Sequence, residues 1–170
     1  MKILKIVQVF IFICVVPLLS AQTFKFGHID SQKLVTELPE FNEAQKQLEA
    51  EATVLEDRRN IMQEEVERKF TEYISQRDEM PDLIRATMEK DIQDLQQRLE
   101  SYNMLAQQSL AKKQQDLLQP IIDKVNRAIE QVGDENGFIY IFDVSMQIVL
   151  YYSTASTDCM QMVKQKLGVK

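Results

Sequence analysis

The sequence is poor in glycine, proline and cysteine. Its 170 residues include four glycines, four prolines, two cysteines, one histidine and no tryptophan. No glycine falls between residues 41 and 132, and that stretch contains only two prolines. The chain has no Gly-rich phosphate loop, no nucleophile motif and no CxxC pair, which are the usual arrangements for catalysis or redox chemistry. We therefore expect a protein that is not an enzyme and that uses no cofactor and no metal.

The glycine-free stretch is rich in residues that favour helices. Glu, Gln, Lys, Arg, Leu, Ala and Met dominate it. Apolar residues recur in steps of three and four from Phe41 to Tyr73 and again from Met88 to Val132. This spacing is typical of one face of a helix. We therefore predict an antiparallel helical hairpin over residues 41–132. Each arm would extend roughly 60 Å, too far for a compact domain of this size.

Two prolines divide this stretch. Pro81 lies in a polar segment between the two runs, so we place the hairpin tip at about residues 75–83, with Pro81 in the first turn of the second helix. Pro120 falls inside the second run, and the apolar spacing continues beyond it. Proline in a helix interior removes a hydrogen bond and clashes with the preceding turn. We predict a kink at Pro120 rather than the end of the helix.

The beginning of the mature chain predicts a strand and a short helix. Residues 23–30 alternate apolar and polar side chains, which is typical of a strand. Gly27 lies within it and indicates a close approach of another part of the chain. Residues 31–38 predict a short helix that Asp30 or Ser31 would cap and that Pro39 interrupts.

The end of the chain predicts two further strands and a helix. Residues 138–144 and 148–152 are rich in β-branched and aromatic residues, and the short connection at 145–147 predicts a hairpin between them. Both faces of these strands are apolar, which indicates burial on both sides.

The sequence also predicts where the helices on either side of these strands begin and end. Gly133 is expected to end the second arm, followed by a loop over residues 134–137. Ser156 or Thr157 would cap a last helix that runs through Leu167 and ends at Gly168.

The predicted fold is α+β. Residues 22–40 and 133–170 would form a small β body, from which the long hairpin of residues 41–132 projects. A body of roughly 60 residues rarely buries enough surface to be comfortably stable. Oligomerisation through the sheet would cover its edges. The residues that we assign to this body and its oligomer contacts are Phe26, Ile29, Phe138, Tyr140, Phe142, Ile148 and Leu150.

The first 21 residues have the features of a cleaved signal peptide. Lys2 and Lys5 precede an apolar run from Ile6 to Leu19, and Ser20 and Ala21 supply small residues for cleavage. The run is shorter than the 20 or so residues of a membrane span, so a retained anchor is the weaker interpretation. We expect the mature chain to begin after Ala21 and to be exported.

The mature chain is acidic. The full sequence has a net charge of −6, and without its first 21 residues it has 18 basic and 26 acidic side chains, or −8. Because binding to phosphate needs a basic face, this balance argues against nucleic acid as a partner. It also argues against electrostatic binding to an anionic membrane.

Two single residues have more than one interpretation. Cys159 is the only cysteine after export, so it cannot form a disulfide within the chain; it is either a partly buried, inert thiol or part of a disulfide between chains. His28, with Asp30 and Asp143, forms either a metal or acid–base site or, as is more common for a lone histidine, a structural feature.

The order of these elements resembles the Skp/OmpH family of periplasmic chaperones over essentially the whole chain. Four local stretches carry the resemblance: FGHIDSQKL at 26–34, ELPEF at 37–41, LQPII at 118–122 and GFIY at 137–140. The resemblance implies a homotrimer in which three hairpins hang from a central β body around a cavity. It further implies an ATP-independent holdase that binds unfolded outer-membrane proteins there and prevents their aggregation.

One departure from the family concerns charge. Well-known members have strongly basic arms, whereas residues 70–90 here have five acidic and three basic side chains. Binding to lipid or lipopolysaccharide, and electrostatic capture of acidic clients, are therefore not carried over. We expect apolar contacts to matter more than charge.

The apolar residues of the arms have two interpretations. Most would form the seam between the two helices, as helical apolar stripes usually do. Near the tip there is little to bury against, and methionine suits unspecific contacts. We therefore assign a client-binding role to Met62, Phe70, Tyr73, Met80, Met88, Tyr102 and Met104. The alternative function is a structural or adaptor coiled coil that binds one defined folded partner of the cell envelope.

Overall fold

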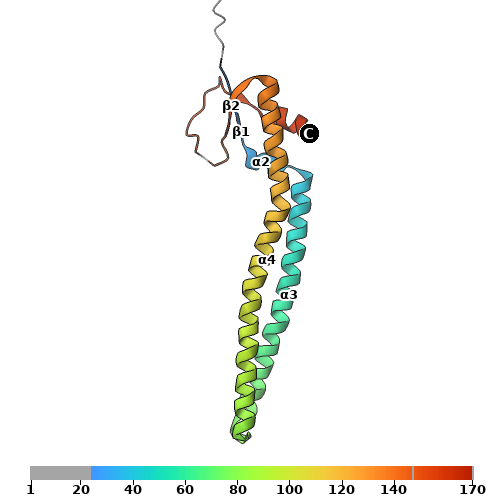
Figure 1. The fold of residues 1–170 in the computed structure, drawn as a ribbon, viewed down its shortest axis with the longest axis vertical. Helices are drawn as coiled ribbons and strands as arrows, with labels where there is room; N and C mark the ends of the chain where they lie inside the picture. The colour runs from blue at the N-terminus through green and yellow to red at the C-terminus, as the bar shows by residue number, and fades with distance from the viewer. Residues whose placement is uncertain (1–23, 147, 170) are drawn as a thin grey trace, which may run out of the picture.

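The computed structural model describes residues 24–146 and 148–169. A small three-stranded sheet lies at one end, and a long helical hairpin extends from it (Figure 1). No helix in the described ranges is long and apolar enough to cross a membrane. The elements in chain order are β1 (Lys25–Ile29), α2 (Ser31–Thr36), α3 (Pro39–Gln76), η1 (Arg77–Glu79), α4 (Asp82–Asn136), β2 (Phe138–Asp143), β3 (Thr157–Asp158) and α5 (Met160–Leu167).

The hairpin consists of two helices of unequal length. Helix α3 has 38 residues and α4 has 55, so the upper part of α4 continues past α3 and packs on the body (Figure 1). The turn lies at η1, and Pro81 occupies the N-cap of α4. Helix α4 continues through Pro120 without ending there. The long helices and the small sheet confirm the α+β class that the sequence predicts.

The end of α4 differs from the prediction. Gly133 does not end the helix, and residues 134–136 are helical rather than a loop. Gly137 is the C-cap instead, with φ of +67°, and its N–H donates to the carbonyl oxygens of Asp134 and Gly133. Of the two glycines near this end, only the second adopts the left-handed conformation that terminates helices.

The sheet is parallel throughout. Its order is β2-β1-β3, with Phe26 opposite Tyr140 and His28 opposite both Phe142 and Asp158. Parallel neighbours need a long crossover connection. Here the whole helical hairpin is the crossover from β1 to β2, which places the hairpin bases beside the sheet.

The predicted strand over residues 148–152 and its hairpin with residues 138–144 are wrong. Among the described residues, positions 148–152 belong to no strand, and Figure 1 shows the chain after β2 as an open loop beside the sheet. The chain crosses to the far side of β1, where Thr157 and Asp158 pair with it as β3. Because β3 runs parallel to β1, the chain must return toward the other end of the sheet after β2, and it does so as a loop rather than as a paired strand.

The last helix begins later than predicted. Thr157 lies in β3, and α5 starts at Met160, so neither Ser156 nor Thr157 caps it. The carboxylate of Asp158 accepts a hydrogen bond from the Met160 N–H at 2.8 Å and satisfies one free donor of the first turn. Gly168 ends the helix with φ of +74°, as its sequence position predicts.

The core lies between the inner face of the sheet and the helices. Ile29 from β1 packs with Leu34 and Leu38 at the start of the chain, and with Val125 and Val132 of α4. Cys159 and Val163 close it from the C-terminal side, and both are fully buried.

Gly27 provides the close approach that its place in a strand predicts. A Cβ atom at this position would lie 2.5 Å from the sulfur of Cys159 and 3.1 Å from the ring of Phe138. The absence of a side chain therefore lets β1 pack directly against the thiol.

Polar contacts tie the two ends of the chain together. Ser31 donates hydrogen bonds to Asp143, and Lys164 of α5 forms an ion pair with Glu37 after α2. Burial opposes ionisation of Asp143, but hydrogen bonds from Ser31 and Ser145 outweigh it and lower its pKa. The hydrogen bond from Lys164 lowers the pKa of Glu37. These contacts connect segments more than 100 residues apart.

Candidate interaction surfaces

The outer face of the sheet is aromatic and open to solvent. Phe26, Tyr140 and Phe142 are 41%, 60% and 45% exposed, and their rings form a row with centroid distances of 6.4 Å and 5.7 Å. We call these three residues the aromatic face. They lie on the side of the strands opposite the buried Ile29, because side chains alternate along a strand.

The loop after β2 adds further exposed apolar side chains. Ile148 and Leu150 are 78% and 95% exposed, and Tyr151 is 81% exposed. Ile148 and Leu150, which the sequence assigns to the body and its oligomer contacts, are therefore exposed, and so are the three residues of the aromatic face. Ile29 is buried in the core of the subunit and Phe138 packs against that core.

His28 has structural partners on this side of the sheet. Its ring lies 4.1 Å from the ring of Tyr152, and its Nδ1 is 2.9 Å from the hydroxyl of Ser156. Asp30 caps α2, and Asp143 accepts from Ser31. The described residues contain no group of His, Cys, Asp and Glu side chains that could hold a metal ion. The geometry fits a residue that anchors the loop.

Tyrosines join the two arms. The hydroxyl of Tyr73 donates to the Glu89 carboxylate at 2.5 Å, and that of Tyr102 donates to the Leu55 carbonyl at 3.1 Å. The bond to Glu89 raises the pKa of Tyr73, because only the protonated phenol can donate it. Both residues, predicted to contact clients, therefore also contribute to the seam between α3 and α4.

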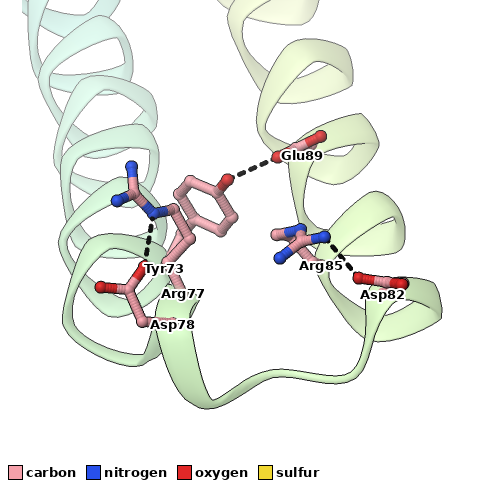
Figure 2. A network of polar contacts seen from close by, with 6 residues as sticks. All are labelled: Tyr73, Arg77, Asp78, Asp82, Arg85 and Glu89. Carbon is pink, nitrogen blue, oxygen red and sulfur yellow. Dashed lines mark hydrogen bonds and ion pairs between the residues drawn. The ribbon is translucent and has the colours of Figure 1, made fainter.

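The tip is held by short-range charged contacts. Figure 2 shows Arg77 paired with Asp78 on one side and Arg85 paired with Asp82 on the other, with the Tyr73–Glu89 bond between the arms above them. Leu83, at the start of α4, is 78% exposed. The tip therefore combines paired charges with exposed apolar side chains.

A groove lies halfway along the hairpin. It has a volume of about 910 Å³ and is lined from both arms. Met62, Leu95 and Tyr102 contribute apolar surface, and Ile61 and Leu105 line it while remaining 64% exposed. The rest of the lining is polar. It consists of two basic, two acidic and two uncharged residues: Arg58, Arg98, Glu65, Asp94, Gln97 and Ser101. We call this the mid-arm groove.

Most of the chain matches one known protein family. The family described as outer membrane protein (OmpH-like) matches residues 25–167, which is most of the chain. The chain belongs to the OmpH-like family. This confirms the family resemblance seen in the four local stretches. A search of curated proteins found no match.

Members of the OmpH-like family are periplasmic chaperones of outer-membrane proteins rather than enzymes. The matched region includes the body and both arms, so it covers the aromatic face as well as the mid-arm groove. The predicted signal peptide at residues 1–21 lies outside the described residues.

In the structure of this OmpH-like protein, the residues assigned to client binding lie in several different regions of the arms. Met62 and Tyr102 come together in the mid-arm groove. Phe70 and Met104 are 49% and 56% exposed elsewhere on the arms. Tyr73, Met80 and Met88 are partly buried near the tip.

Sequence reasoning missed several apolar residues of the arms. Val54, Ile61 and Leu105 are each about two-thirds exposed. They fall between the positions of the apolar stripe, where helical periodicity predicts polar residues. Their position outside the stripe could have identified them from the sequence as exposed, because an apolar residue outside the seam of a two-helix hairpin has nothing to pack against.

Proposed function

We propose that this chain is an ATP-independent holdase of the periplasm. It binds unfolded outer-membrane proteins between its helical arms and prevents their aggregation. Three copies associate through the β body, and their arms enclose a cavity. The residues assigned to client contact are Met62, Phe70, Tyr73, Met80, Met88, Tyr102 and Met104.

The observation that carries this proposal is the exposed apolar surface of the arms. Among the residues described in α3 and α4, only Ala44, Ile92 and a group beyond Pro120 are buried. The arms nevertheless carry several large apolar side chains that are about half exposed or more: Val54, Ile61, Phe70, Ile74, Leu83, Ile84, Met104 and Leu105. A long hairpin with exposed apolar side chains can make many weak contacts with a chain that has no fixed structure.

The aromatic face supports assembly into an oligomer. Contiguous exposed apolar surface on a soluble protein commonly marks an interaction site. In the part of the chain that the structure describes, β2 has only β1 as a neighbour, so its other edge is free to pair. Association of copies at this face and edge would cover Phe26, Tyr140 and Phe142. We assign the exposed loop residues Ile148 and Leu150 to the same contact.

The proposal is tested by aggregation of an outer-membrane barrel protein diluted from urea. We expect the protein, in excess and without nucleotide, to suppress the increase in light scattering. A lack of protection at several-fold excess of the trimer would reject the holdase. A specific, saturable complex with one folded envelope protein, without protection of unfolded chains, would favour the adaptor.

A further inference from the structure

The net negative charge of the molecule lies in its two long helices. Residues 39–136, from the start of α3 to the end of α4, carry 22 acidic and 13 basic side chains, a net charge of −9. The rest of the mature chain carries four acidic and five basic ones and is nearly neutral. A molecule bound along the arms therefore meets a negative electrostatic potential that the body does not share.

The mid-arm groove lies within this acidic surface. Residues 54–69 and 91–105, which include every residue that lines it, carry eight acidic and five basic side chains. In the lining itself, Arg58 and Arg98 balance Glu65 and Asp94. The groove thus presents an electrically balanced, mainly apolar lining inside a negative surround.

The apolar lining is accessible from solvent. Ile61 and Leu105 come from opposite arms and are both 64% exposed, although they line the same groove. Met62 lies beside Ile61 and adds a flexible side chain, which suits contacts with varied partners. A volume of about 910 Å³ is near the upper end of the usual range for binding pockets, about 300–1,000 Å³, and accommodates several side chains.

We propose that the mid-arm groove binds extended apolar segments of unfolded chains that carry basic residues on their flanks. This inference rests on the proposed holdase function and names the preferred class of client for it. The apolar centre of the segment covers Ile61, Met62 and Leu105. The basic flanks lie over the acidic surfaces of α3 and α4 on either side.

Charge selects among clients here, while apolar contact retains them. Like charges brought together disfavour a wrong partner, and opposite charges accelerate encounter. An unfolded chain with acidic flanks is therefore repelled by the arms even when its apolar segment fits the groove. The preference should weaken with salt, because exposed charges are screened within about 8 Å at physiological ionic strength.

The inference is tested with two dye-labelled peptides that share one apolar centre and carry either lysine or glutamate flanks. Binding to the mature protein is measured by fluorescence anisotropy at low and high salt. At low salt we expect the lysine peptide to bind about tenfold more tightly than the glutamate peptide. At about 0.5 M salt the ratio should fall below about threefold.

A pair of variants locates the binding site. The groove variant combines Ile61→Gln with Leu105→Gln, and the control is Ile122→Gln, an exposed apolar residue of α4 outside the groove and outside the proposed client surface. The two groove side chains are 64% exposed and Ile122 is 40% exposed, and glutamine is a good helix former, so both variants should fold. We expect the groove variant to bind the lysine peptide about tenfold more weakly, and the control to stay within about twofold of the unchanged protein.

The outcomes separate this inference from the proposed function. Equal binding of the two peptides, a preference for glutamate, or equal effects of the two variants would overturn the inference. A change of oligomeric mass in the groove variant alone would assign the groove to a contact between copies and overturn it as well. The unchanged protein is assayed in parallel for protection of an unfolded outer-membrane protein, and only failure there counts against the holdase function.

Discussion

At the scale of single residues, the contact between Gly27 and Cys159 shows what the sequence could and could not predict. A glycine inside a strand indicates that something approaches closely, and the structure confirms it. The approaching atom is the sulfur of Cys159, 132 residues further along the chain. Nothing local in the sequence identifies that partner, because it depends on β3 pairing with β1 on the side away from β2.

Gly27→Ala should destabilise the protein. Its new methyl group would lie 2.5 Å from the sulfur of Cys159, so β1 or the thiol must move. We expect a loss of about 1–3 kcal/mol in the free energy of unfolding, measured by urea denaturation. Gly133→Ala is the matched control, since its nearest atom would be 3.7 Å away and alanine favours the helix. Adding Cys159→Ala to Gly27→Ala should recover part of the loss; a neutral Gly27→Ala would contradict the packing described here.

The thiol of Cys159 should be unreactive in the folded protein. Burial raises its pKa, and the neighbouring Asp158 raises it further, so little reactive thiolate forms near neutral pH. The side chain is also fully buried. A thiol reagent at pH 8 should modify it slowly in buffer and rapidly in urea. Rapid modification of the folded protein, or isolation of a disulfide-linked dimer, would favour the other interpretation of this residue.

At the scale of elements, predictions succeeded where the pattern is local. Apolar spacing predicted the hairpin, since a helix makes its hydrogen bonds within a few residues. The segment at 148–152 has the composition of a strand, but composition does not say which segment reaches an edge of the sheet. In the structure residues 157–158, rather than 148–152, pair with β1. Gly133 and Gly137 are equally good helix terminators by type, and only the structure shows which one adopts a positive φ.

The outer half of the hairpin should depend on Ile92. Among the described residues of α3 and α4 between Ala44 and Ile121, it is the only buried one. Ile92→Ala should cost about 2–4 kcal/mol locally. We expect hydrogen exchange to accelerate in the outer half of the arms while β1 and α5 keep their protection, because weakly packed regions open independently. Leu95→Ala, at a partly exposed site, should have a smaller effect; equal acceleration in the body would show that arms and body unfold as one unit.

At the scale of the whole molecule, the body and the arms differ in charge and in packing. Nearly all of the buried residues lie in the nearly neutral body or at the base of the hairpin that packs on it, while the acidic arms expose apolar side chains along their length. Composition alone gave the net charge, but the mid-arm groove required the structure, because Ile61 and Leu105 come from opposite arms. The aromatic face likewise required the register that places Phe26 opposite Tyr140.

Placing charge on the aromatic face should dissociate the oligomer. Tyr140→Glu and Phe142→Glu together would bury two carboxylates if the face is covered, which is costly without partners. We expect the mass in solution to fall to that of one subunit, with the helical signal of the arms retained. Val54→Glu on an exposed arm position is the control and should leave the mass unchanged. An unchanged mass in the double variant would place the contact between copies elsewhere.

The most direct test of the holdase proposal is the mass of the mature protein, measured by light scattering during size exclusion, alone and with an unfolded outer-membrane barrel protein. We expect three copies alone, and a complex of three copies with one unfolded client after mixing. A single-copy mass that does not change when the unfolded client is added would contradict both the assembly and the function.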